Sequence, residues 1–133
     1  MGKICRAIWA VFIFIVVGLT PTVLSAQPGS TLDIEAELSR PGVKLVVVEF
    51  FATWCEPCMA AVPEWKALHE KYASKGLRFI VVSAEGDETC SKPPDWSPDR
   101  TICDKDGSLM QEMEVEKLPT SFIYSWEGNL AMR

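Results

Sequence analysis

Two cysteines, Cys55 and Cys58, stand two residues apart in the segment "FFATWCEPCMAAVPEW", between an apolar run and a run compatible with a helix. Thiols at this spacing can do three kinds of chemistry. They can supply half of a metal site, form a structural disulfide, or act as a catalytic dithiol that exchanges disulfides with other molecules. The rest of the chain has to discriminate among these three.

The other residues of the chain argue against a metal site. A structural zinc site needs four ligands, usually two CxxC pairs or one pair with two histidines. The only histidine is His69, and Cys90 and Cys103 do not form a second CxxC. A purely structural bridge between Cys55 and Cys58 remains an alternative, but so small a ring constrains little of the unfolded chain. We therefore predict no metal site.

The elements around the two cysteines favour the catalytic dithiol. Residues 45–48 form a continuous apolar run rich in valine, which predicts a strand buried on both faces. Residues 55–74 alternate apolar and charged side chains as an amphipathic helix does, and Gly76 would end that helix. Cys55 then lies at a helix N-terminus, where the helix dipole and free N–H groups stabilise a thiolate. Residues 77–83 predict a second buried strand.

The remaining elements are shorter, and residues 85–101, which are rich in proline and acids, predict a loop. The other expected elements are a helix over 31–39 capped by Ser30 or Thr31, a strand over 101–103, a turn over 104–107, a helix over 108–113 capped by Ser108, a strand over 121–124 and a part-strand over 130–132. A strand–helix–strand unit followed by antiparallel strands predicts an α/β sandwich with a mixed sheet.

The N-terminal block has the layout of a secretory signal peptide. Lys3 and Arg6 precede an uncharged apolar stretch, and small residues end at Ala26. We expect a signal peptide over residues 1–26, with an uncleaved membrane anchor as the alternative, then a linker over 27–30 and one domain over 31–133. The expected mature chain carries 11 basic and 18 acidic residues, a net charge of −7. An acidic domain without a basic cluster is not expected to bind nucleic acid.

The segment "VVVEFFATWCEPCMAAVP" and the later "LPTSF" resemble the thioredoxin superfamily. They are most similar to its exported TlpA- and ResA-like thiol–disulfide oxidoreductases, and the resemblance covers roughly residues 31–132. It implies a thioredoxin-like three-layer sandwich. It also implies that Cys55 is the nucleophile, that Cys58 is the buried resolving thiol, and that Trp54 shields the active site.

The resemblance assigns further support residues. Pro119, followed by Thr120, matches the cis-proline that sits against the dithiol, and Pro63 matches the proline that kinks the active-site helix. Glu56 and Pro57 are the pair between the cysteines. The negative charge of Glu56 disfavours a thiolate on the neighbouring cysteine, which favours a reductase.

Glu49 stands six residues before Cys55, where thioredoxins carry a buried acid that accepts a proton from the second cysteine. The alternative is a side chain that turns outward at a strand edge. Two departures from the family pattern concern the same site. Ala61 stands where ResA-like proteins often have an acid, and Lys117 stands where a glycine is common. We also expect the domain to lack the C-terminal helix of the family.

Cys90 and Cys103 flank the proline-rich loop. Three states are possible for them: a structural disulfide, two free thiols, or a second dithiol that passes electrons to Cys55. In an exported protein the first would remove two spare thiols and fix an irregular segment. His69 is expected to be a solvated surface residue. The segment from Asp104 to Gly107 is expected to be a plain turn, because it lacks the other ligands of a calcium loop.

These observations together predict an exported, periplasmic or otherwise extracytoplasmic thiol–disulfide oxidoreductase that needs no cofactor. The expected partners are protein disulfides, of which apocytochrome c is the common case in the family, and a membrane-bound thiol–disulfide electron donor. The alternative is a non-catalytic module of the same fold that uses Cys55 and Cys58 to hold copper or a haem-related ligand.

Overall fold

The computed structural model describes residues 32–85 and 90–132 of the 133-residue chain. In chain order, the elements are α1 (Ile34–Leu38), β1 (Leu45–Phe51), α2 (Glu56–Tyr72), the 3₁₀ turn η1 (Ala73–Lys75), β2 (Leu77–Ser83), β3 (Arg100–Cys103), α3 (Ser108–Glu112), β4 (Thr120–Ser125) and β5 (Leu130–Met132). The expected signal peptide over 1–26 and linker over 27–30 lie outside the described residues. Within the two described ranges, no helix combines the length and apolar character that a membrane span requires.

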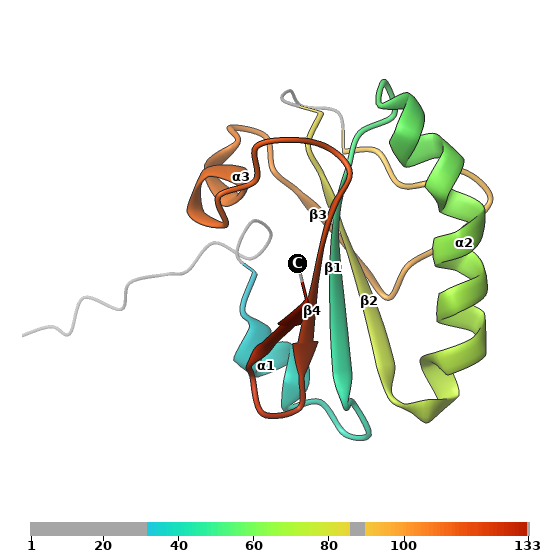
Figure 1. The fold of residues 1–133 in the computed structure, drawn as a ribbon, viewed down its shortest axis with the longest axis vertical. Coiled ribbons are helices and arrows are strands. Elements are labelled where there is room, and N and C mark those ends of the chain that lie inside the picture. Colours follow the sequence, from blue (N-terminus) through green and yellow to red (C-terminus); the bar gives the residue numbers. More distant parts are fainter. Residues whose placement is uncertain (1–31, 86–89, 133) are drawn as a thin grey trace, which may run out of the picture.

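The five strands form one mixed sheet in the order β3-β2-β1-β4-β5. β1 pairs in parallel with β2, and β2 in parallel with β3, whereas β4 runs antiparallel to both β1 and β5. α2 covers one face of the sheet, and α1 and α3 lie on the other (Figure 1). The predicted three-layer α/β sandwich with a mixed sheet is therefore confirmed. No helix follows β5 in the described part of the chain.

β1 is buried on both faces, as its apolar run predicts. Because successive strand side chains point to opposite faces, β1 serves two cores. Val47 and Phe51 pack with Cys58 and Trp65 under α2. The intervening residues Val46, Val48 and Phe50 pack on the other face with Leu109 of α3. One strand thus connects both halves of the hydrophobic core.

α2 begins at the predicted place because Cys55 is its N-cap residue. Pro63 lies within the helix, which continues to Tyr72 before the turn η1. Gly76 then adopts φ +101°, where a side chain is disfavoured, and a Cβ there would lie 2.5 Å from the carbonyl oxygen of Gly42. The close approach of two chain segments explains why glycine ends this unit.

The two short helices have caps other than the predicted ones. α1 is capped by Asp33, whose Oδ1 accepts from the N–H of Ala36 at 2.9 Å, and not by Ser30 or Thr31. The N-cap position of α3 is Gly107 and not Ser108. The carboxylate of the buried Asp104 instead accepts from the N–H groups of Leu109 and Met110 at 3.0 and 2.9 Å. A carboxylate that reaches across a turn was not foreseen from local spacing.

A buried carboxylate ties α1 to the sheet. Glu37, 2% exposed, forms ion pairs with Arg40 on its own helix, with Arg78 of β2 and with Arg100 of β3. Burial alone would raise the pKa of Glu37. The hydrogen bonds from Arg100 and Arg78, with the charges of Arg78 and Arg40, outweigh burial and hold the pKa below its ordinary value.

The prediction of a solvated His69 is wrong, because a loop covers it. Its side chain is 14% exposed and its Nε2 lies 2.9 Å from Oδ2 of Asp99. The indole N–H of Trp96 points to His69 Nδ1 at 3.2 Å. Trp96 itself is buried against Phe79. The histidine thus anchors the loop after β2 to the side of α2, a contact between residues far apart in sequence.

Candidate active site

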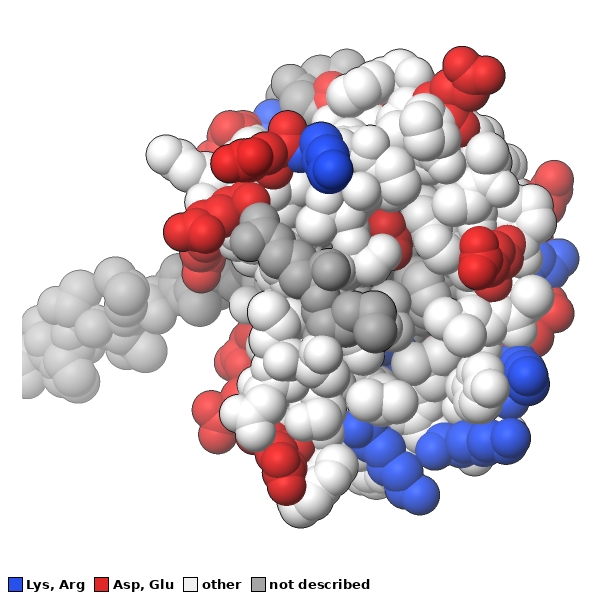
Figure 2. All heavy atoms as spheres, viewed as in Figure 1, with Lys and Arg blue, Asp and Glu red and all other residues white. Residues whose placement is uncertain are grey.

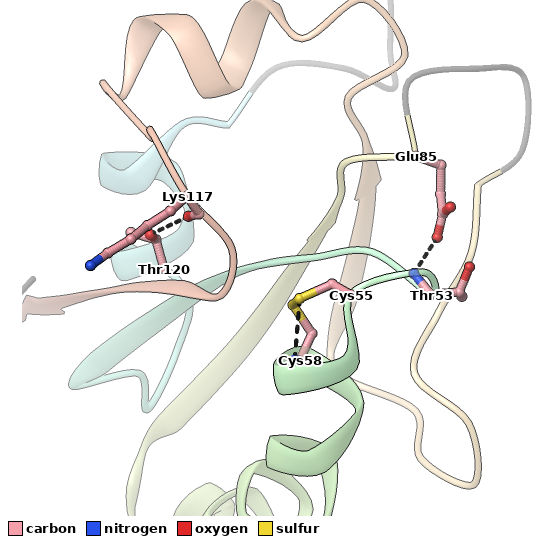
Figure 3. Close-up of a disulfide and its surroundings, with 6 residues drawn as sticks. All are labelled: Thr53, Cys55, Cys58, Glu85, Lys117 and Thr120. Carbon is pink, nitrogen blue, oxygen red and sulfur yellow. Dashed lines mark hydrogen bonds between the residues drawn. A yellow bond between two sulfur atoms is a disulfide. The ribbon is translucent and has the colours of Figure 1, made fainter.

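Cys55 and Cys58 are joined by a disulfide at the start of α2, with their Cα atoms 5.2 Å apart (Figure 3). Cys55 has extended backbone geometry as the N-cap, and its Sγ accepts from the N–H of Cys58 at 3.2 Å. This N–H is one of the helix-terminal donors that lack a partner within the helix. The same donor can stabilise a thiolate at Cys55 once the disulfide is reduced.

Both cysteines are shielded from solvent in the disulfide form. Cys58 is fully buried, as the resemblance implied for it, and Cys55 is only 5% exposed. The Cys55 sulfur is bonded to Cys58 and lies at the first turn of α2, where it accepts the Cys58 N–H. Trp54 is 68% exposed, so it is not a core residue. Glu56 and Pro57 are also exposed at the surface.

Glu85 is a residue of this site that the sequence analysis missed. It follows β2, and its Oε1 accepts from the backbone N–H of Thr53 at 2.7 Å (Figure 3). Next to it, the N–H of Ala84 bonds to the carbonyl of Phe51 at 2.8 Å. Hydrogen bonding between the segment that follows β2 and the segment that follows β1 therefore extends beyond the two strands, up to Thr53 just before Cys55. Only the parallel register of β1 and β2 brings these residues together, and local sequence does not encode that register.

On the other side of the disulfide from Glu85 lies the turn that leads into β4, with Lys117 before the strand and Thr120 as its first residue (Figure 3). The Leu118–Pro119 peptide bond is cis, as the resemblance implied for Pro119. The hydroxyl of Thr120 donates to the carbonyl of Lys117 at 2.7 Å and closes the turn. Leu118 packs against the core cluster that holds Cys55 and Cys58. The cis-proline turn and the disulfide are thus connected through the core.

A groove of about 590 Å³ opens beside this turn. Its walls are formed by Glu114, Glu116, Lys117, Pro119, Thr120, Ser121 and Ile123. On the face shown in Figure 2, acidic side chains predominate at the end of the molecule where α2 begins, and the basic side chains gather at the opposite end. Of the charged residues that line the groove, Glu114 and Glu116 are acidic and Lys117 is basic.

Glu49 points into the protein and is 1% exposed, which excludes the outward alternative. It lies on the same face of β1 as Val47 and Phe51, the face that α2 covers with Cys58. Burial raises the pKa of Glu49 to about 7, while a hydrogen bond donated by Ser121 to Oε2 acts in the opposite direction. Its Oε1 is buried and has no hydrogen-bond partner among the described residues.

Cys90 and Cys103 form a second disulfide, with Cα atoms 5.2 Å apart. Cys103 lies in β3 opposite Ser83 of β2, and the Ser83 hydroxyl accepts from the N–H of Ser91 at 3.1 Å. The bridge therefore holds the start of the loop 90–99 against the end of the sheet. In this arrangement the two thiols are bonded to each other and are not a free dithiol beside Cys55.

The described residues contain no group of three or more His, Cys, Asp or Glu side chains arranged to hold a metal ion. The acids of the turn 104–107 serve the backbone. Asp104 caps α3, and Oδ1 of Asp106 accepts from the N–H of Ser108 at 3.1 Å. These carboxylates stabilise the turn that the sequence predicted, and Asp104 also stabilises the start of α3, which the sequence did not predict.

Comparison with known proteins agrees with this geometry. The family model described as Redoxin matches residues 11–132. The thiol-disulfide oxidoreductase ResA of Oceanobacillus iheyensis is 30% identical over 97 residues, which cover 71% of this chain and 50% of the relative. The chain spans about half the length of the curated ResA relatives that it matches.

Two solved structures establish the fold. A DsbE-like thiol:disulfide interchange protein from Chlorobium tepidum aligns with a TM-score of 0.63 at 22% identity, over 79% of this chain and 75% of that chain. The exposed lipoprotein thioredoxin of Streptococcus pneumoniae aligns with a TM-score of 0.53 at 21% identity, over 71% and 76%. The fold is thioredoxin-like, and the resemblance to ResA-like proteins is confirmed. Since the Redoxin model spans most of the sequence, the chain belongs to the Redoxin family of the thioredoxin superfamily.

Proposed function

We propose that this protein is a thiol–disulfide oxidoreductase that exchanges disulfides with protein substrates through Cys55 and Cys58. The observation that carries the proposal is the position of the disulfide. Cys55 caps α2, and its sulfur accepts a backbone N–H from the first turn. A thiolate formed there is stabilised by the helix N-terminus. The sulfur of Cys58 is close enough to bond to it, because the two are already joined in the disulfide.

In the reducing direction, the Cys55 thiolate attacks one sulfur of a substrate disulfide. A mixed disulfide forms, and the other substrate sulfur leaves as a thiolate that takes up a proton. Cys58 then loses its proton and attacks the Cys55 sulfur, which releases the second substrate thiol. The Cys55–Cys58 pair loses two electrons and becomes a disulfide, and the substrate disulfide gains the two electrons and becomes two thiols.

Glu49 is the proposed proton acceptor for Cys58. A base for this step must lie in the protein interior with a pKa near the working pH. The buried carboxylate with a pKa of about 7 meets this condition, and it lies on the sheet face that α2 covers. Position 61 on α2, where ResA-like proteins often have an acid, is an alanine here. Glu49 is therefore the buried acid that we propose for this role.

The acidic surroundings favour a reductase. Glu56 follows Cys55 directly, and Glu85 is bonded to Thr53, two residues before it. Negative charges near Cys55 destabilise its thiolate and so favour the oxidised pair. A pair that is more stable when oxidised gives its electrons to substrates more readily.

We place this activity outside the cytoplasm, with residues 1–26 as the export signal. The Cys90–Cys103 bridge supports this placement, because structural disulfides persist in oxidising compartments. The name of the pneumococcal relative, an exposed lipoprotein, agrees with it. The disulfide of oxidised apocytochrome c is the substrate we propose to test first, and a membrane-bound thiol–disulfide protein is the proposed electron donor.

Insulin reduction tests the proposal. Wild type should accelerate precipitation of the insulin B chain in the presence of dithiothreitol. Cys55→Ser should abolish that acceleration, and Cys58→Ser should accumulate mixed disulfides visible by mass spectrometry. A parallel copper titration addresses the non-catalytic alternative. Stoichiometric copper binding that requires both thiols, without insulin reduction, would overturn the proposed activity.

A further inference from the structure

The buried position of Glu49 raises the question of how its proton reaches solvent. A carboxylate that accepts a proton from Cys58 must release it before the next turnover. Glu49 is 1% exposed, so the carboxylate has no direct contact with water through an open surface. A neighbouring side chain that can both donate and accept a hydrogen bond would provide such a route.

Ser121 is such a neighbour. In the sheet, Glu49 on β1 lies opposite Val81 of β2 on one side and Ser121 of β4 on the other. Val81 is apolar and cannot carry a proton. The hydroxyl of Ser121 donates to Oε2 of Glu49. The α2 residues buried on this face are Cys58, Val62 and Trp65, of which only Cys58 can titrate.

Ser121 also reaches the surface. It is partly exposed and forms part of the groove beside the cis-proline turn. The charged residues of that groove are Glu114, Glu116 and Lys117. The two oxygens of Glu49 therefore have different surroundings. Oε1 is buried and has no hydrogen-bond partner among the described residues, whereas Oε2 is bonded to the hydroxyl of Ser121, a residue that lines the groove.

We propose that Ser121 is the positioning residue of Glu49 and the route by which its proton reaches the groove. The inference rests on the proposed role of Glu49. Cys58 gives its proton to the carboxylate as its sulfur bonds to Cys55. The protonated carboxyl group then rotates so that its O–H donates to the Ser121 oxygen, and the Ser121 hydroxyl hydrogen turns away from Oε2 toward water in the groove. The carboxyl proton passes to the Ser121 oxygen as the Ser121 hydroxyl hydrogen passes to that water. Ser121 is unchanged at the end, and no electron moves in this transfer.

The test compares Ser121→Val with Ser121→Thr. The two side chains have nearly the same shape and both suit a strand, so they differ mainly in the hydroxyl. The first measurement is the pH titration of the Glu49 carboxyl carbon by NMR, in the disulfide form, where neither Cys55 nor Cys58 titrates. Loss of a hydrogen bond to the carboxylate should raise the pKa of Glu49 in Ser121→Val by about one unit. Ser121→Thr should titrate as wild type does.

The second measurement is the rate of the resolving step in single-turnover kinetics. At a higher pKa, less of Glu49 is ionised at pH 7, so Ser121→Val should resolve the mixed disulfide about five-fold more slowly. The difference should vanish near pH 9, and Ser121→Thr should restore the wild-type profile. Denaturant unfolding of both variants, which should coincide, shows that the fold is not the cause.

Identical Glu49 titrations and identical pH–rate profiles for the two variants would overturn the role of Ser121. Glu49→Gln separates this failure from a failure of the proposed function. If Glu49→Gln slows the resolving step but the Ser121 variants do not differ, Glu49 is the base and its proton leaves by another route. If Glu49→Gln resolves as fast as wild type, the proposed role of Glu49 fails, and the relay through Ser121 fails with it.

Discussion

The carboxylate of Glu85 accepts the backbone N–H of Thr53 at 2.7 Å, two residues before the first active-site cysteine. The contact joins the end of β2 to the loop that leads into α2. It fixes the backbone of that loop and places a negative charge beside the redox pair. These two effects can be separated, because glutamine keeps the accepting oxygen and removes the charge.

Glu85→Gln should make the reduction potential of the Cys55–Cys58 pair less negative by on the order of 10 mV, because the reduced, thiolate-bearing form loses a repulsive neighbour. The measurement is equilibration against glutathione buffers. Glu64→Gln, an exposed acid further along α2, is the matched control and should leave the potential unchanged. A shift of equal size in both variants would show that only net charge matters.

Glu37→Gln should lower the free energy of unfolding by about 2 kcal/mol at pH 7, since three arginines lose the charge they share. The folded-state pKa of Glu37 is depressed, so its contribution is present above pH 4.5 and is lost as pH falls through the folded pKa. Urea unfolding checks both statements. Glu35→Gln, an exposed acid on the same helix, should change stability little; an equal loss would contradict the role of the arginine contacts.

Glu49→Gln should stabilise the disulfide form at pH 8 by up to about 3 kcal/mol and have little effect at pH 4. The folded-state pKa of about 7 lies above the ordinary 4.5, so the fold favours the protonated acid. Wild-type stability should therefore fall as pH rises from 4.5 to 7 and then level off. Urea unfolding across this range is the measurement, and a parallel pH dependence in both proteins would count against a raised pKa.

Replacing Cys90 and Cys103 together by serine should lower the free energy of unfolding by about 3 kcal/mol, because the unfolded chain regains the entropy of an open loop. Mass mapping of a non-reducing digest should show the Cys90–Cys103 cross-linked peptide. The bridge should survive mild reduction that opens Cys55–Cys58. Two freely alkylated thiols in the untreated protein would refute the bridge.

Local patterns predicted the parts of the fold that are encoded locally. The valine-rich run before Cys55, the helix after it and the strand ending at Ser83 all followed from hydrophobic periodicity and a glycine stop. Each of these depends on residues within one or two elements. The buried Glu49 was implied by the resemblance to thioredoxins, which carry a buried acid at this spacing from the CxxC motif, whereas the residues alone left the outward alternative open.

The contacts that were missed join residues distant in sequence. Glu37 meets Arg100, 63 residues away, and His69 meets Trp96, 27 residues away. Such pairs exist only after the strand order and the loop path are set. Charge spacing along the chain gives no sign of them, because buried ion pairs and surface charges use the same residue types. Glu85 was missed because its partner Thr53 is 32 residues away and meets it only once β1 and β2 are paired.

The central place of β1 in the sheet determines how damage to the fold would affect the proposed activity. Glu49 and the approach to Cys55 share one strand that has neighbours on both sides, whereas the groove depends on β4, next to the three-residue edge strand β5. Amide hydrogens of β5 should exchange first and those of β1 last. Mild destabilisation should therefore weaken substrate capture, seen as a higher KM, before it slows the sulfur chemistry itself.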